Sequence, residues 1–307
     1  MKPARDVLVR ATACDGMVRC VAAITTRLVD EASRRHRTSP TVSAALGRTL
    51  TAGALLGSML KDTEKVTILL QCTGPIGGIT VEADARGNVR GYAKNPQVDL
   101  PLTEKKKFDV SGAVGGGMLY VLREADYYRT GLFRDPYCGS VPIVSGEIAE
   151  DVAYYLTQSE QIPSAVSLGV FVLPDEERFF RVAAAGGFLI QTFPGVSNDV
   201  LRDLEASLLA TPYVTEMIRQ GMGPREILHT ALGAYTFEIL EEKELRFACT
   251  CSFERARRIL AALDLEELRA MLREDGGAEM VCHFCNATYR FDADDLRALL
   301  LERDPAT

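Results

Sequence analysis

The chain has 307 residues, of which 47% are hydrophobic and 25% charged, and its formal net charge is −7. This length favours two compact units, and the composition is that of a globular protein rather than a disordered chain. The acidic balance disfavours nucleic acid as a partner, because a polyanion would be repelled. No apolar run approaches the roughly 20 residues that span a bilayer, and charges interrupt residues 1–15. We therefore expect no membrane span and no signal peptide, and a cytoplasmic protein.

The first half of the chain carries mainly strand signals. Residues 7–13 and 17–24 are apolar and β-branched on either side of Cys14-Asp15-Gly16, which predicts a hairpin. Ser39-Pro40 predicts the start of a long buried helix that ends near residue 60. Further strands are expected at 66–71, 78–83, 89–93 and 118–122, followed by a helix from Ser145 to about Gln158.

The second half changes from strands to helices. Residues 165–173 and 179–190 are expected to form a strand pair, after which apolar residues repeat at helical spacing. Thr211-Pro212 and residues 221–224 break the following segment into short helices. We therefore predict an α+β fold in three parts: a strand-rich core with packed helices at 1–195, a helical linker at 196–244, and a small C-terminal domain at 245–307.

Two cysteine pairs lie close together near the C-terminus. Cys249-Thr250-Cys251 is followed, after thirty residues, by Cys282-His283-Phe284-Cys285. Zinc binds four thiolates in a tetrahedron, and each short pair can present two sulfurs from one turn. We therefore predict one zinc ion held by Cys249, Cys251, Cys282 and Cys285. Four sulfur ligands leave no open coordination position, so the predicted site is structural or regulatory rather than catalytic.

The predicted zinc domain is too small to fold on apolar burial alone. Asp264 precedes a helix that carries Leu265, Leu268 and Leu272 at helical spacing, and Asp292 precedes a last helix. Such a small core depends on its metal, so losing zinc should unfold the domain. Nearby arginines would favour thiolates if they approach the cysteines, or they lie on a solvated helix face. They are Arg246, Arg255, Arg257, Arg258 and Arg290.

The other reactive residues give no second site. His283 is expected to point away from the metal, and His36 and His229 stand in no Cys-His or Ser-His-acid pattern, so we expect no enzyme. The glycine clusters at 74–78 and 112–117 lack a phosphate-binding spacing and predict turns or close backbone approach. The basic residues 34–37 are interpreted as a solvated helix end. No role is assigned to Cys14, Cys20, Cys72 and Cys138, which are interpreted as small hydrophobic residues.

Several segments closely resemble the 33 kDa chaperonin, or heat shock protein 33, family. The resemblance is most specific around the four cysteines, in ACTCSFER at 248–255 and VCHFCNATYRF at 281–291. It extends through the core at 144–151, 159–166, 168–170 and 185–191. Two features depart from the family: residues 118–131 do not match the expected core stretch, and Cys72 and Cys138 stand where no thiols are expected.

The resemblance implies a redox-regulated, ATP-independent holdase chaperone. Reduced and zinc-bound, such a protein is inactive, whereas oxidation and unfolding stress release zinc, form disulfides and expose surface that captures unfolding proteins. By position, the implied disulfides join Cys249 with Cys251 and Cys282 with Cys285. The resemblance also implies that the linker packs on the core until activation and then contributes to client binding, that activation is accompanied by dimerisation, and that no nucleotide is needed.

Two other functions stay open from the residues alone. A zinc-ribbon nucleic-acid-binding protein should show a basic, aromatic face near the cysteines. The acidic residues Glu266, Glu267, Asp292, Asp294 and Asp295 count against it. A thiol-disulfide oxidoreductase that uses Cys282 and Cys285 should place them at a helix start in a thioredoxin-like setting. The second cysteine pair counts against this alternative.

Overall fold

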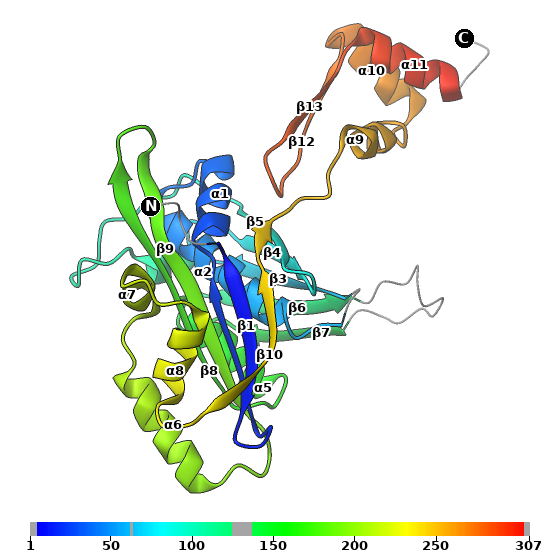
Figure 1. The fold of residues 1–307 in the computed structure, drawn as a ribbon. Helices are drawn as coiled ribbons and strands as arrows, with labels where there is room; N and C mark the ends of the chain where they lie inside the picture. The colour runs from blue at the N-terminus through cyan, green and yellow to red at the C-terminus, as the bar shows by residue number, and fades with distance from the viewer. Residues whose placement is uncertain (1–4, 62–63, 125–136, 304–307) are drawn as a thin grey trace. The chain divides into compact units, whose positions relative to one another are not determined.

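The computed structural model describes residues 5–61, 64–124 and 137–303. The chain divides into two compact units, Met1–Ala248 and Cys249–Thr307. Strands and helices are mixed in both units, which confirms the predicted α+β class (Figure 1). Over the described ranges, no helix has both the length and the apolar character that crossing a bilayer requires.

An antiparallel five-stranded sheet forms one layer of the first unit. Its strands run in the order β10-β1-β2-β9-β8. They are β1 (Val7–Ala13), β2 (Val18–Ile24), β8 (Ser164–Asp175), β9 (Phe179–Thr192) and β10 (Phe237–Glu244). The expected pairs β1–β2 and β8–β9 are both confirmed. Cys14 and Asp15 have left-handed φ angles of 51° and 53°, which close the first hairpin.

A six-stranded sheet forms a second layer, in the order β11-β5-β4-β3-β6-β7. Its strands are β3 (Lys65–Cys72), β4 (Ile79–Asp84), β5 (Asn88–Ala93), β6 (Gly117–Glu124), β7 (Tyr137–Pro142) and β11 (Arg246–Phe247). The four strands expected between residues 66 and 122 are confirmed, whereas β7 and β11 were not expected. Of the unmatched stretch 118–131, residues up to 124 lie in β6 and the rest falls outside the described residues.

The glycine clusters bring backbone against backbone. A Cβ on Gly117, which has a φ of 130°, would lie 1.9 Å from the carbonyl oxygen of Gln71. A Cβ on Gly74 would lie 2.5 Å from the carbonyl oxygen of Ala113. Only glycine fits such contacts, so the expectation of close backbone approach is confirmed.

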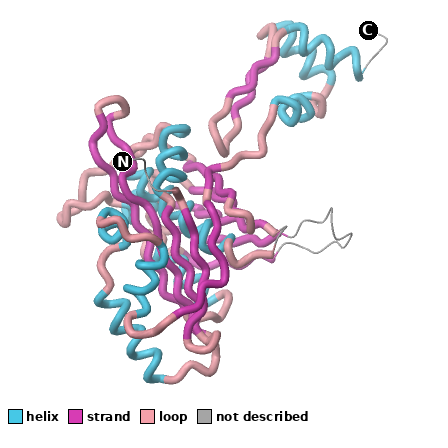
Figure 2. The backbone as a smooth tube through the Cα atoms, in the orientation of Figure 1, coloured by secondary structure: helices cyan, strands magenta, loops and turns pink. Residues whose placement is uncertain are grey.

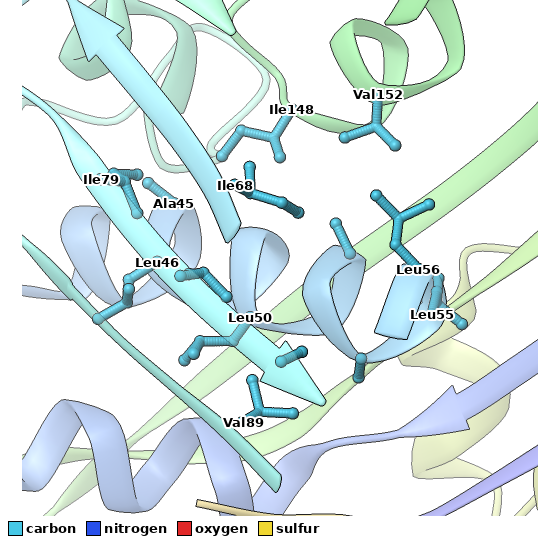
Figure 3. Packing of buried hydrophobic residues seen from close by; sticks show 14 of the residues in the cluster. Ala45, Leu46, Leu50, Leu55, Leu56, Ile68, Ile79, Val89, Ile148 and Val152 are labelled. Carbon is cyan, nitrogen blue, oxygen red and sulfur yellow. The ribbon is translucent and has the colours of Figure 1, made fainter. Parts of the chain in front are cut away.

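The long helix α2 (Pro40–Gly57) lies between the two sheets. The Ser39 hydroxyl accepts the backbone N–H of Val42 at 3.1 Å, and Pro40 occupies the first helical position, as predicted. The helix packs against β4 of one sheet and against β8 and β9 of the other, so it is apolar around its whole circumference. Figure 3 shows Leu46 and Leu50 of this helix among Ile68 and Val89 of the six-stranded sheet.

Among the described residues, three further helices complete this core: α1 (Thr26–His36), α3 (Val110–Val114) and α5 (Ala149–Gln158). Helix α5 was expected, with Ser145 as its cap, but the anchoring group is Asp151. Its fully buried carboxylate accepts the backbone N–H groups of Val144, Ser145 and Ile148 at 2.8, 2.8 and 2.9 Å. A carboxylate with two acceptor oxygens can satisfy three donors that a single hydroxyl cannot.

The outer face of the five-stranded sheet is covered by α6 (Asn198–Ala210), α7 (Val214–Arg219) and α8 (Pro224–Leu232). The predicted breaks at Thr211-Pro212 and at residues 221–224 separate these helices. Leu204, Met217 and Leu228 are buried in a second core against Phe188 and Ile190 of β9. This core lies on the side of the sheet opposite to α2.

The end of the segment differs from the expected helical pattern, because Phe237–Glu244 forms strand β10. Its residues alternate between half-buried and exposed, which is the period of a strand, and they pair with β1. Residues 196–244 lie in the same compact unit as the sheets. That residues 196–244 act as a linker that separates from the core therefore stays a prediction.

Over residues 249–303, the second unit contains three helices and one hairpin (Figure 2). They are α9 (Phe253–Leu260), α10 (Leu265–Glu274), β12 (Ala278–Val281), β13 (Thr288–Phe291) and α11 (Ala293–Arg303). Its core consists of Ala256, Leu260, Leu268, Phe291, Leu296 and Leu299. Asp264 and Asp292 stand at the starts of α10 and α11 as expected. The hairpin was not expected, because its strands have only four residues each.

Candidate metal centre

Four cysteine sulfurs converge in the second unit. Cys249 and Cys251 lie just before α9, and Cys282 and Cys285 lie in the turn between β12 and β13. All four Sγ atoms lie within 4.8 Å of one another, with Cys249 and Cys282 3.7 Å apart and Cys251 and Cys285 3.3 Å apart. At a zinc–sulfur distance of about 2.3 Å, a tetrahedron separates its sulfurs by about 3.8 Å. The cluster therefore fits a tetrahedral metal ion.

A tight turn presents the second pair of sulfurs. The N–H of Cys282 donates to the carbonyl of Ala287 at 2.9 Å, and Asn286, with a φ of 57°, returns its N–H to the carbonyl of Cys282 at 2.7 Å. The N–H groups of Phe284 and Cys285 donate to the sulfur of Cys282, and that of Ala287 donates to the sulfur of Cys285. These N–H groups favour thiolates, which are the metal-binding form.

Burial favours the protonated form of the thiols of Cys282 and Cys285. Burial raises the pKa of the Cys282 thiol, and the N–H groups of Cys285 and Phe284 oppose that rise. Burial also raises the pKa of the Cys285 thiol, and its contacts with the other three sulfurs add to the rise. Four thiolates at this separation repel one another, so a cation between them is needed to hold all four ionised.

Tyr289 supports the cluster and was missed by the sequence analysis. Its hydroxyl donates to the sulfur of Cys251 at 3.1 Å, and this hydrogen bond raises the pKa of Tyr289. The β12–β13 pairing brings Tyr289 there, which spacing alone could not reveal. Metal ligands are usually oriented by such partners. The rings of Phe253 and Phe291 stack with their centroids 4.6 Å apart and join the start of α9 to β13.

The nearby arginines contact other groups. Arg257 pairs with Glu302, and Arg290 pairs with Glu279 at 2.9 Å. Arg255 and Arg258 are exposed on α9, and the Arg255 guanidinium donates to the hydroxyl of Thr250 at 3.4 Å. Arg246 lies in β11 of the first unit, where its Nε donates to Asn88 at 2.6 Å. His283 is exposed and is not part of the sulfur cluster.

The four other cysteines lie in the first unit. Burial raises the pKa of Cys20 to about 12 and that of Cys72 to about 11, and it also raises the pKa of Cys14. These thiols are protonated at neutral pH and therefore react slowly with oxidants. Cys138 is exposed on β7.

Known proteins match the chain over nearly its whole length. The family model described as Hsp33 protein matches residues 6–292. Proteins named 33 kDa chaperonin from Shouchella clausii and Bacillus subtilis are each 46% identical and cover 98% of this chain and 99% of their own length. A crystal structure of the 33 kDa chaperonin, a heat shock protein 33 homologue, from Thermotoga maritima has a TM-score of 0.89 at 36% identity, covering 98% of this chain and 99% of that one. The chain therefore belongs to the Hsp33 protein family, a family of chaperones.

Proposed function

We propose that this protein is a redox-regulated, ATP-independent holdase chaperone that acts in the cytoplasm under oxidative stress. The observation that carries the proposal is the cluster of four sulfurs within 4.8 Å, in a chain that belongs to a chaperone family. Its partners are unfolding proteins, which it keeps from aggregating. It needs neither nucleotide nor nucleic acid and forms no bond with its client, so it is not an enzyme.

The metal of the reduced form is one zinc ion, and its ligands are Cys249, Cys251, Cys282 and Cys285. Four thiolates and no open position suit a structural zinc site. When bound, the ion crosslinks the segment before α9 to the turn between β12 and β13. Without that crosslink the second unit depends on six buried side chains, too few for a stable domain.

Oxidation of the sulfurs is the switch. Two thiols that form a disulfide give up two protons and two electrons, and hydrogen peroxide takes these up to become two water molecules. We propose the pairs Cys249 with Cys251 and Cys282 with Cys285. Sulfurs in disulfides no longer ligate zinc, so the second unit loses its main support.

The client-binding surface would come from the first unit. Residues 196–244 cover one face of the five-stranded sheet, and their release would expose Phe188, Ile190 and other apolar residues of that face. Exposed apolar surface of this kind binds unfolded chains and promotes self-association. Dimerisation on activation is therefore part of the proposal.

Light scattering of a thermally unfolding client protein tests the proposal. The chain is compared in its reduced, zinc-loaded form and after peroxide treatment under mild heat, with Cys138→Ser as the control variant and Cys282→Ser as the test variant. Suppression of aggregation by the oxidised form alone, unchanged in Cys138→Ser, supports the switch. Equal activity of both forms would make the metal merely structural. Failure of both forms would favour the nucleic-acid alternative, to be tested by gel shift.

A further inference from the structure

Three of the four edge strands of the large sheets, over the described residues, are protected against pairing with another chain. Strand β10 has charge at five of its eight residues, as read from FEILEEKE. Strand β11 has only two residues. Strand β7 has six and ends in Pro142. Charges, short length and proline are the usual means by which proteins keep an edge from recruiting a further strand.

The fourth edge strand, β8, has none of this protection along most of its length. It has twelve residues, SAVSLGVFVLPD, and no charged residue before Asp175. Within the described part of the chain it pairs only with β9. Residues 164–173 are all half-exposed, whereas residues 184–191 of the neighbouring β9 are all buried. The outer edge of β8 therefore carries no further strand, and helices α5 and α7 pack against this strand.

The register identifies the backbone groups that this edge presents. The N–H of Thr192 donates to the carbonyl of Pro163 at 3.1 Å, so the pair 163/192 is hydrogen-bonded. Hydrogen-bonded and non-hydrogen-bonded pairs alternate along an antiparallel ladder. The N–H and C=O groups of Val166, Leu168 and Val170 consequently point away from β9. They are spaced to receive one more strand.

We propose that the outer edge of β8, at residues 166–170, binds an extended apolar segment of an unfolded client by strand addition. Only an extended backbone can satisfy a row of outward N–H and C=O groups. The lack of charge along β8 selects apolar segments, which are the segments that unfolding proteins expose. This inference rests on the proposed function, because it assigns the client of that chaperone to a particular strand.

Helix α7 restricts access to the same strand. A Cβ on Gly169 would lie 2.9 Å from Cγ1 of Val214 and 2.7 Å from Cγ2 of Thr215, so α7 touches this face of β8. The guanidinium of Arg219 lies 4.2 Å from the ring centre of Phe171. Alternate side chains of an added strand would meet α7. Release of residues 196–244 therefore makes room for the client, which links strand addition to the redox state.

The test uses an apolar eight-residue peptide and the same peptide N-methylated at alternate residues. Both carry the same side chains, but the methylated peptide cannot pair along one edge. We expect the oxidised full-length chain to bind the unmethylated peptide at least about tenfold more tightly, measured by fluorescence anisotropy. Hydrogen exchange should show new protection at the outward amides of Val166, Leu168 and Val170. Equal affinity for the two peptides, or protection only elsewhere, would overturn the proposal.

Two proline variants form a matched pair. Val166→Pro removes an outward N–H from β8 while leaving its bonds to β9, and Ser140→Pro makes the same change at an outward position of β7, an edge of the other sheet. We expect only Val166→Pro to weaken peptide binding, again about tenfold. If Val166→Pro does not fold, the exchange measurement on the unaltered chain still decides.

The same experiments separate this inference from the proposed function. If oxidised Val166→Pro suppresses client aggregation as well as the unaltered chain, strand addition fails and the holdase function stands. If the unaltered chain binds the peptide at β8 but never suppresses aggregation, the holdase function fails instead. Protection of the outward amides of β8 without peptide, growing with protein concentration, would identify a second copy as the occupant and overturn the proposal.

Discussion

Removing the metal from the reduced protein should unfold the second unit and leave the first unit folded. Five side chains larger than alanine are buried in its core, and at roughly 2 kcal/mol each they contribute about 10 kcal/mol. Structural zinc sites contribute about 10–16 kcal/mol of apparent binding free energy. Metal binding thus contributes at least as much free energy as the burial of all the apolar side chains. A domain this small is not stable enough to stay folded without it. The core of the first unit contains none of the four clustered cysteines.

Hydrogen exchange before and after a zinc chelator is the assay, with metal release followed by a colorimetric indicator. We expect amide protection to disappear across residues 253–303 and to persist in β1, β2 and β9. Reduced Cys138→Ser serves as the control, since its thiol lies outside the cluster. If residues 253–303 keep their protection after the metal has left, the apolar core suffices on its own and the proposed coupling between metal and folding is wrong.

Tyr289→Phe should weaken zinc binding about tenfold in chelator competition, because the hydroxyl that orients Cys251 is lost, whereas Tyr235→Phe should have no effect. Asp151→Ala should lower the free energy of unfolding of the first unit by about 3 kcal/mol in urea, since three buried N–H groups lose their acceptor, and the exposed Glu150→Ala should change it little. Burial raises the pKa of Asp6 to about 6 from 3.8, so its contribution to stability is full below pH 4 and is lost as the pH rises through 6. Asp6→Asn should therefore reduce the loss of stability between pH 4 and 7 by about 3 kcal/mol, and an unchanged loss would mean that Asp6 ionises freely.

Features set by neighbouring residues were predictable from the sequence. Ser39-Pro40 marks the start of α2 because the cap and the proline act within one turn of the helix. The four cysteines identify a metal site because each pair already has ligand spacing, and the fold only has to bring two turns together. The breaks between α6, α7 and α8 follow from prolines that cannot continue a helix.

Features that depend on distant partners were not predictable. Strand β10 has few apolar residues. It forms because its backbone can hydrogen-bond to β1, which lies more than 200 residues earlier in the chain. Strand β11 pairs with β5 in the same way. Tyr289 reaches the sulfur of Cys251 only once the β12–β13 hairpin exists. Ser145 was predicted as the cap of α5, whereas the structure shows Asp151 in this role. A local pattern does not show which side chain reaches the buried N–H donors.

Strand β10 is where the proposed switch has to act on the first unit. It is the only strand between α8 and β11, and beyond it the chain is tied by Leu245 to the carbonyl of Asp6 and by Ala248 to that of Val89. An edge strand with five charges and a bulge opposite Arg10 is among the weaker elements of a sheet. Disorder that begins at Cys249 would reach α6–α8 through the chain only by displacing this strand. Its poor apolar content, which hid it from sequence analysis, also makes it the element of the five-stranded sheet that is easiest to release.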